Sequence, residues 1–110
     1  MTTISFESQG DCLTGFSVEG HSGFAPQGED DILCAAITSA VRLIECAVND
    51  VLGLGAAVKA QEETASISLK LPGGLSEETD QVCQTLLHSM MVYFVQLSEE
   101  YPDNIIVLEV

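Results

Sequence analysis

Two residues in the first third of the chain have the types and the spacing of a nucleophile and its base. His21 and Cys34 lie thirteen positions apart in the stretch GHSGFAPQGEDDILCAA, which covers residues 20–36. A cysteine attacks a carbonyl carbon as its thiolate, and a histidine can take up the thiol proton and return it to the leaving group. Gly20 and Gly23 flank the histidine, so the backbone can turn sharply there. The pair could therefore carry out nucleophilic acyl transfer.

The surroundings of Cys34 fit two interpretations. Asp30 or Asp31 could be the N-cap of a helix, which would place the thiol in the first turn, where unpaired backbone N–H groups favour an anion. The same N–H groups could hold the oxyanion of a tetrahedral intermediate. Cys34 also falls on an apolar stripe with Ile37 and Val41, and cysteine is among the most buried residue types. Periodicity alone favours a core cysteine, so the choice stays open at this point.

The remaining histidine and cysteines are weaker candidates. His88 falls off the main apolar stripe of its predicted helix and is expected at the surface or partly packed. Cys12, Cys46 and Cys83 have no histidine or cation near them in the sequence, so they are interpreted as structural thiols. No two cysteines show the CxxC spacing of metal sites. We therefore expect no metal and no cofactor.

Alternation of apolar and polar residues predicts the strands that must position this stretch. The first two strands are expected to form a β-hairpin whose turn lies at residues 8–11. The final strand is expected to be well buried because it is almost wholly apolar. The predicted strands cover residues 3–7, 12–19, 57–60, 65–71 and 104–110.

Apolar residues at steps of three and four predict two helices. The first helix contains Cys34, has Val51 as the last residue of its stripe, and ends near Gly53 and Gly55. The second helix is expected to be capped by Ser76, because a serine hydroxyl can accept a hydrogen bond from the first turn. Its predicted buried stripe is Cys83, Leu86, Met90, Phe94 and Leu97.

These elements predict the fold class. Amphipathic helices bury their apolar stripes most simply against one face of a sheet. We therefore predict an α+β fold, with two helices packed on one face of a mixed or antiparallel sheet, in the order β-β-α-β(β)-α-β. A chain of 110 residues suffices for one core, and we expect a single domain, residues 1–110.

The charge balance restricts the partners. Seventeen acidic and three basic residues give a formal net charge of −14, which repels nucleic-acid backbones and anionic lipid surfaces. Direct binding to nucleic acid or to a membrane surface is therefore not expected. The same field would attract a basic peptide or protein segment.

The apolar segments argue against a membrane location. Residues 39–57 form the longest apolar run, but charged and amide residues interrupt it, so no membrane-spanning helix is expected. The first residues lack the basic and apolar regions of a secretory signal. We expect a cytoplasmic protein with reduced thiols.

Two motifs together resemble a known family. The segments GHSGFA and DILCAAIT, at residues 20–25 and 31–38, are similar to the signature of the ribosomal-processing cysteine protease family, Prp. That signature is G-H-x-G-[YF]-A, a short loop with glycine, and D-I-[VL]-C-A-A-x-S. The resemblance implies an α+β homodimer that removes a short N-terminal extension from a large-subunit ribosomal protein, the twenty-seventh. The family's substrate segment is basic and aromatic, in agreement with the acidic balance of this chain.

The resemblance also implies roles for individual residues. Cys34 matches the nucleophile and His21 the general base, while Asp31 and Thr38 match positions linked to the site. Gly20, Gly23 and Gly28 belong to the loop, which is a candidate lid over the substrate.

Two departures from the signature affect these roles. Thr38 replaces the usual serine, which keeps the hydroxyl but adds a methyl group. The interval between His21 and Cys34 is one residue longer than the usual form, so either Asp30 or Asp31 could support the site. Two alternatives remain: a non-catalytic acidic adaptor that binds a basic segment, and a thiol enzyme that acts on another acyl substrate.

Overall fold

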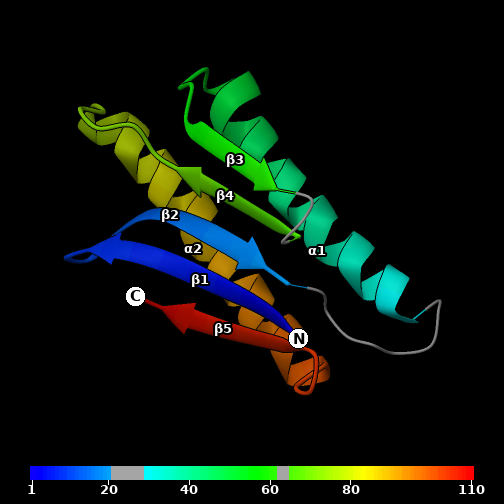
Figure 1. Cartoon of the computed structure of the whole chain (residues 1–110). Coiled ribbons are helices and arrows are strands. Elements are labelled where there is room, and N and C mark those ends of the chain that lie inside the picture. Colours follow the sequence, from blue (N-terminus) through cyan, green and yellow to red (C-terminus); the bar gives the residue numbers. More distant parts are fainter. Residues whose placement is uncertain (21–28, 62–64) are drawn as a thin grey trace.

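The computed structural model describes residues 1–20, 29–61 and 65–110, with the backbone alone for residues 29–31. Figure 1 shows its helices and strands in chain order. They are β1 (Thr2–Gln9), β2 (Cys12–Glu19), α1 (Glu29–Glu45), the π-helical segment η1 (Cys46–Val51), β3 (Ala57–Gln61), β4 (Ser66–Lys70), α2 (Glu77–Glu100) and β5 (Ile105–Glu109).

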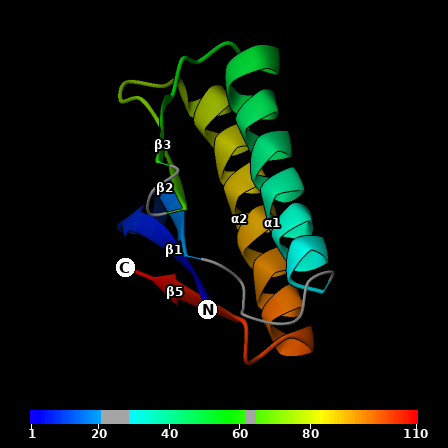
Figure 2. The same ribbon diagram turned by 45° about the vertical axis from the view of Figure 1, so that its right-hand side comes forward.

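The strands form one mixed sheet in the order β3-β4-β2-β1-β5. β1 and β5 are parallel, while the other neighbouring pairs are antiparallel. Both helices cover the same face of this sheet, and the other face has no helix in the described chain (Figure 2). The α2 segment makes the crossover that parallel strands require. The predicted fold class and order of elements are therefore confirmed.

The β1–β2 hairpin forms the middle of the sheet. Its second strand has the predicted bounds, whereas its first is longer than the predicted 3–7, because Gln9 pairs with Cys12 across a two-residue turn in which Gly10 has φ +66°. The left-handed conformation at Gly10 is one that glycine adopts without steric cost. A β-bulge lies between Glu7 and Ser8 and increases the local twist. Phe6 lies opposite Phe16 with ring centroids 6.3 Å apart, in the helix-covered layer.

The first helix begins earlier than the sequence predicted. α1 starts at Glu29, so Asp30 and Asp31 lie inside the helix and neither is its N-cap. Cys34 is consequently in the second turn, about 7.5 Å along the axis from the first helical residue. In that position the backbone N–H of Cys34 belongs to the helix ladder rather than to the four unpaired N-terminal groups.

A π-helical segment after α1 changes which side chains point toward the core. Val48 is fully buried in η1, whereas Val51, predicted to continue the stripe, is 77% exposed. Wider π-helical turns rotate side chains away from the positions that a 3.6-residue period predicts. Asn49 ties the segment to the residue just before β3, since its side chain accepts from Ala56 N–H at 2.7 Å and donates to Ala56 C=O at 3.2 Å.

The second helix has the predicted start and one shifted core residue. Ser76 is its N-cap and accepts a hydrogen bond from the N–H of Thr79 at 3.2 Å, as predicted. Leu87 is fully buried, whereas Leu86 is only partly buried. Both leucines lie three or four residues from Cys83 and Met90, so periodicity could not distinguish them.

The last strand is less buried than predicted. β5 is an edge strand that pairs only with β1. Ile105 is buried under the helices, but Ile106 and Leu108 are each 41% exposed on the face that the helices do not cover. The apolar run indicated a strand correctly but not its place at the edge.

One described helical stretch, Ile32–Val51, is long and apolar enough to cross a membrane by length and composition alone. Core helices of soluble proteins pass the same test, and here Leu33, Ile37 and Val41 pack into the core above the sheet. The opposite side of the helix is also apolar and is exposed, with Ile32 at 69% and Leu43 at 68%. This second apolar side is unusual for a surface helix.

Candidate active site

Cys34 lies in a pocket under the N-terminal half of α1. The pocket has a volume of about 320 Å³, and Cys34, Ile37 and Thr38 of α1 form one wall. Cys34 is half-buried, which is less than the core position that periodicity favoured. A half-buried thiol in a pocket can meet a substrate, whereas a core thiol cannot. Cys34 is therefore not a fully buried core residue, and its role as nucleophile stays a prediction.

The ends of four neighbouring strands form the other walls of the pocket. β2 and β3 end there, and β1 and β4 begin there (Figure 1). Register keeps these ends together, since Ser66 pairs with Glu19 on one side and with Gln61 on the other. The sheet residues that line the pocket are Thr2, Val18, Gly20, Ala60, Gln61, Ala65, Ser66 and Ile67.

Gly20 closes the rim of this pocket next to the segment that carries His21. Its φ is +90°, and a Cβ at this position would lie 2.7 Å from the carbonyl oxygen of Met1. Its N–H donates to the carbonyl of Ala65 at 3.2 Å. Ala65 itself has a φ of +49°, a left-handed conformation that few non-glycine residues adopt. Gly20 is therefore required both by its backbone conformation and by the close approach of the Met1 carbonyl.

The structure brings together some of the predicted site residues. Cys34, Thr38 and Gly20 line the same pocket, with Thr38 one helical turn after the thiol and exposed. Asp31 lies in α1, but its side chain is outside the described part of the structure. His21, Gly23 and Gly28 also lie outside the described residues. The pairing of His21 with Cys34 stays a prediction.

The other cysteines have different surroundings. Cys83 is fully buried, so its assignment as a structural thiol is confirmed, and both burial and the nearby charge of Asp80 raise the pKa of its thiol. A raised pKa disfavours the thiolate that a nucleophile needs. Cys12 and Cys46 are exposed and do not line the Cys34 pocket, so they do not belong to the core, and their assignment as structural thiols stays a prediction. The described ranges contain no group of three His, Cys, Asp or Glu residues that could hold a metal ion.

His88 is part of the surface of α2. Its Nδ1 lies 2.8 Å from the carbonyl oxygen of Gln84, one turn earlier in the same helix, and the residue is partly buried, as predicted. It is not among the residues that line the Cys34 pocket. His88 is therefore not placed to act on that thiol.

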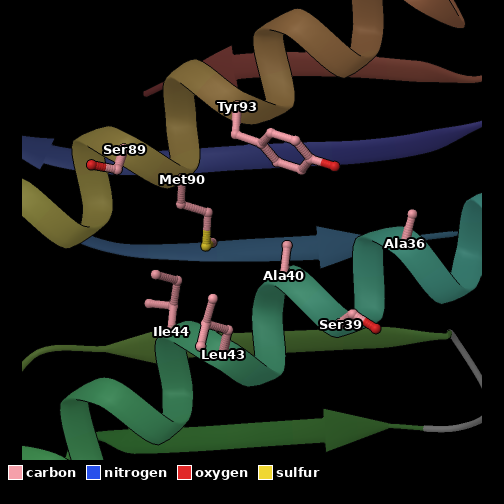
Figure 3. Close-up of a pocket in the computed structure, with 8 residues that line it drawn as sticks. All are labelled: Ala36, Ser39, Ala40, Leu43, Ile44, Ser89, Met90 and Tyr93. Atoms are coloured by element: carbon pink, nitrogen blue, oxygen red, sulfur yellow. The ribbon is translucent and has the colours of Figure 1, made fainter.

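A larger pocket, of about 480 Å³, lies in the outer side of the helix layer. Figure 3 shows Ala40 and Ile44 of α1 pointing toward Met90 of α2 across it. Its lining contains no cysteine, histidine or carboxylate, so it offers no nucleophile and base for acyl transfer. Its residues are Ala36, Ser39, Ala40, Leu43, Ile44, Ser89, Met90 and Tyr93.

Sequence reasoning did not identify the sheet residues of the Cys34 pocket. Thr2, Gln61 and Ser66 carry polar side chains in its walls, but they lie far apart in the sequence. Only the strand order brings them to one edge. For Thr2 a signal existed, because it alternates with Ile4 and Phe6 and so belongs to the helix-covered side of β1.

Several solved structures have this fold. One is the crystal structure of SMU.848 from Streptococcus mutans, with a TM-score of 0.84, 19% identity, and coverage of 100% of this chain and 94% of that chain. Another is an essential ribosomal processing protease Prp from S. aureus with a covalently linked product peptide, with a TM-score of 0.82, 19% identity and full coverage of both chains. The same S. aureus protease with a substrate peptide gives a TM-score of 0.81 at 17% identity, again with full coverage of both chains.

The similarity in sequence comes from a family model rather than from an individual relative. None of the curated proteins matches the chain. The model for the cysteine protease Prp matches residues 1–106, which is nearly the whole chain. The match includes Cys34 and all of its described pocket. This protein therefore belongs to the Prp family of cysteine proteases.

Proposed function

We propose that this protein is an endopeptidase that removes a short N-terminal extension from a large-subunit ribosomal protein, the twenty-seventh, in the cytoplasm. The observation that carries the proposal is the position of Cys34, half-buried in a pocket at the sheet edge from which the His21 segment departs. Two of the similar structures are of a ribosomal processing protease, one with a substrate peptide and one with a covalently linked product peptide.

The proposed reaction is acyl transfer to the thiol followed by hydrolysis. His21 takes the proton of Cys34, and the thiolate sulfur forms a bond with the scissile carbonyl carbon. As the tetrahedral intermediate collapses, the carbon–nitrogen bond breaks and His21 donates its proton to the leaving amine. Water, deprotonated by His21, then attacks the thioester, and the thiol is regenerated with its proton.

The early start of α1 affects how the oxyanion is stabilised. The unpaired N–H groups of a helix are its first four, and here they precede Cys34 by at least two residues. The helix dipole still favours a thiolate near this end, although its effect declines after the first turn. We propose that the backbone amides at the start of α1 bind the oxyanion of the tetrahedral intermediate. Asp31 and Thr38 are proposed to have supporting roles. Gly20, Gly23 and Gly28 would shape the loop above the pocket.

The first prediction tests the nucleophile. Cys34→Ala should abolish cleavage of the extended ribosomal protein, because no other group in the proposed reaction can form the thioester. Cleavage is measured by the masses of the fragments after incubation with the purified protein. Cys12→Ala is the matched control, since Cys12 is exposed and outside the pocket, and it should cleave at the wild-type rate.

The same experiment separates the protease from the alternatives. A non-catalytic adaptor would bind the extended protein without producing fragments, and alkylation of Cys34 would not affect its binding. A thiol enzyme with another substrate would leave the ribosomal protein intact. Its Cys34 would still be labelled by iodoacetamide, and this labelling would be lost when His21 is replaced by alanine. Full cleavage by Cys34→Ala would contradict the proposed mechanism.

We further propose that the protein forms a homodimer through the outer helix face, defined here as Ile32, Leu43, Val82, Val92 and Tyr93. All five are exposed apolar or aromatic side chains on the two helices. Residues 81–98 of α2 contain none of the seventeen acidic and three basic residues of the chain. Like charges would repel two copies with a net charge of −14 each, and an uncharged face is where they can approach.

The second prediction concerns this dimer. Leu43→Glu should convert the protein to a monomer, because a buried and unpaired carboxylate in an interface is strongly unfavourable. Sedimentation velocity measures the mass of the particle in solution. Leu108→Glu is the matched control: Leu108 is exposed on β5, on the opposite side of the sheet, and this variant should keep the wild-type mass. Identical masses for both variants would refute the assignment of this face.

A further inference from the structure

Thr2 is a buried polar residue in the wall of the Cys34 pocket. It is the first residue of β1 and alternates with Ile4 and Phe6 on the helix-covered side of the sheet. Only 2% of its surface is exposed, and it is the one polar residue among the buried residues of the described chain. Its position lies between the core and the pocket that contains the thiol.

The backbone of Thr2 is held on two sides. Its N–H donates to the carbonyl of Asn104 at 2.8 Å, and the residue pairs with Ile105 of β5. Its Cα lies 4.0 Å from the point that a Cβ at Gly20 would occupy, so β1 and the start of the His21 segment are in contact. A side chain on such a fixed backbone presents its hydroxyl in a restricted direction.

Thr2 lines the pocket, and two observations indicate that its hydroxyl belongs to the exposed part of the residue. In the described residues, no side-chain oxygen or nitrogen is both fully buried and without a hydrogen-bond partner. The side-chain hydrogen bonds of that part of the chain do not include one to Thr2. The small exposed part of this residue must therefore include its oxygen. There the hydroxyl can bond to water in the open pocket, or to a polar group of a ligand that displaces this water.

Most of the other residues that line the pocket are apolar. Val18, Ile37 and Ile67 are among them. A peptide that enters such a pocket loses water from its backbone C=O and N–H groups, and each group needs a new partner. Thr2 belongs to the sheet wall of the pocket and Cys34 to its helix wall, and a threonine hydroxyl can donate a hydrogen bond to such a group.

From this geometry we propose that Thr2 is a substrate-binding residue whose hydroxyl donates a hydrogen bond to a backbone carbonyl of the peptide beside Cys34. The proposal rests on the proposed function, because the ligand is the peptide that the thiol would cleave. The hydroxyl does not take part in bond making or breaking. Its loss should weaken peptide binding and raise KM, with little change in kcat.

The test compares Thr2→Val with Thr2→Ser. Both are made in the Cys34→Ala background, so that a fluorescent peptide with the sequence of the ribosomal extension binds without being cleaved. Thr2→Val keeps the shape and removes the hydroxyl, and it should raise Kd about five- to tenfold. Thr2→Ser keeps the hydroxyl and should stay within about twofold of the parent. The melting temperature of each variant is compared with that of the Cys34→Ala parent as a control for folding. If Thr2→Val melts at a lower temperature than the parent, Thr2→Ala is used in its place.

The outcomes separate this proposal from the proposed function. An unchanged Kd in Thr2→Val, or an equal loss in Thr2→Val and Thr2→Ser, would overturn the role of the hydroxyl even if the wild type cleaves the peptide. If the Cys34→Ala protein binds the peptide but the wild type does not cleave it, the protease function fails and the Kd comparison still decides the role of Thr2. If the peptide does not bind, the role of Thr2 is rejected, and cleavage by the wild type decides the function independently.

Discussion

At the scale of single residues, the same thiol group has different chemistry in different surroundings. Cys83 is enclosed by the core near Asp80, and its raised pKa keeps it protonated. Cys34 is half-buried and opens to a pocket. Both residues lie on apolar helical stripes in the sequence, so their difference comes from what packs against each helix.

The third prediction concerns Gly20. Gly20→Ala should destabilise the protein by more than about 2 kcal/mol, because a left-handed φ costs an alanine roughly 1–2 kcal/mol and the added Cβ also meets the Met1 carbonyl. Urea unfolding measures the free energy. Peptide cleavage should fall further than stability alone requires, since the change displaces the segment that carries His21.

Gly74→Ala is the control for the conformational part of this effect. Gly74 has a φ of +73°, but a Cβ there would have no atom within 4 Å. Its replacement should cost only about 1 kcal/mol and leave cleavage unchanged. Equal costs for the two variants would show that the contact with the Met1 carbonyl is unimportant.

At the scale of elements, α2 holds the sheet and the helix layer together. Its buried stripe packs against the sheet, and Gln84 adds two hydrogen bonds to the backbone of Leu13 in β2, at 2.7 and 2.8 Å. These bonds satisfy an N–H and a C=O of β2 beside the bulged part of the hairpin. α2 thereby fixes the hairpin whose far end forms part of the Cys34 pocket.

The fourth prediction distinguishes the two central leucines of α2. Leu87→Ala should lower the free energy of unfolding by about 2–5 kcal/mol, because it leaves a cavity in the core. Leu86→Ala should cost less than about 1.5 kcal/mol, since its partly buried side chain is packed on one side only. Chemical unfolding of both variants checks this order, and the reverse order would place Leu86 rather than Leu87 in the core.

At the scale of the whole molecule, charge and apolar surface are separated. The middle of α2 is uncharged, whereas its first turn carries Glu77, Glu78 and Asp80 and its last turn Glu99 and Glu100. The negative charge of α2 thus lies at its two ends. Such an arrangement permits both attraction of a basic substrate and association through the helices.

The fifth prediction follows from the net charge of −14. Raising the NaCl concentration from about 50 to 500 mM should lower kcat/KM for a basic peptide by roughly tenfold, because salt screens long-range attraction. Steady-state cleavage rates measure this effect. A peptide with glutamine in place of each lysine should lose most of the salt dependence, and an equal dependence for both peptides would contradict the electrostatic origin.

The sequence alone determined the order of strands and helices, the hairpin and the cap at Ser76. These features depend on local patterns: alternation, helical spacing and side-chain to backbone bonding within a few residues. The two motifs around His21 and Cys34 also indicated the family, which the match over residues 1–106 confirms. The roles of the individual site residues are predictions from those motifs.

Only the tertiary structure decided which residues surround the thiol and which stripe residue is buried. The strand order β3-β4-β2-β1-β5 brings Thr2, Gln61 and Ser66 to the edge where α1 carries Cys34. The tertiary structure also shows that Leu87 is buried rather than Leu86, and that α1 begins before Asp30. It places β5 as an edge strand of the sheet. A one-dimensional pattern gives the side of an element on which a residue lies. Which neighbour covers that side depends on contacts between residues distant in the sequence.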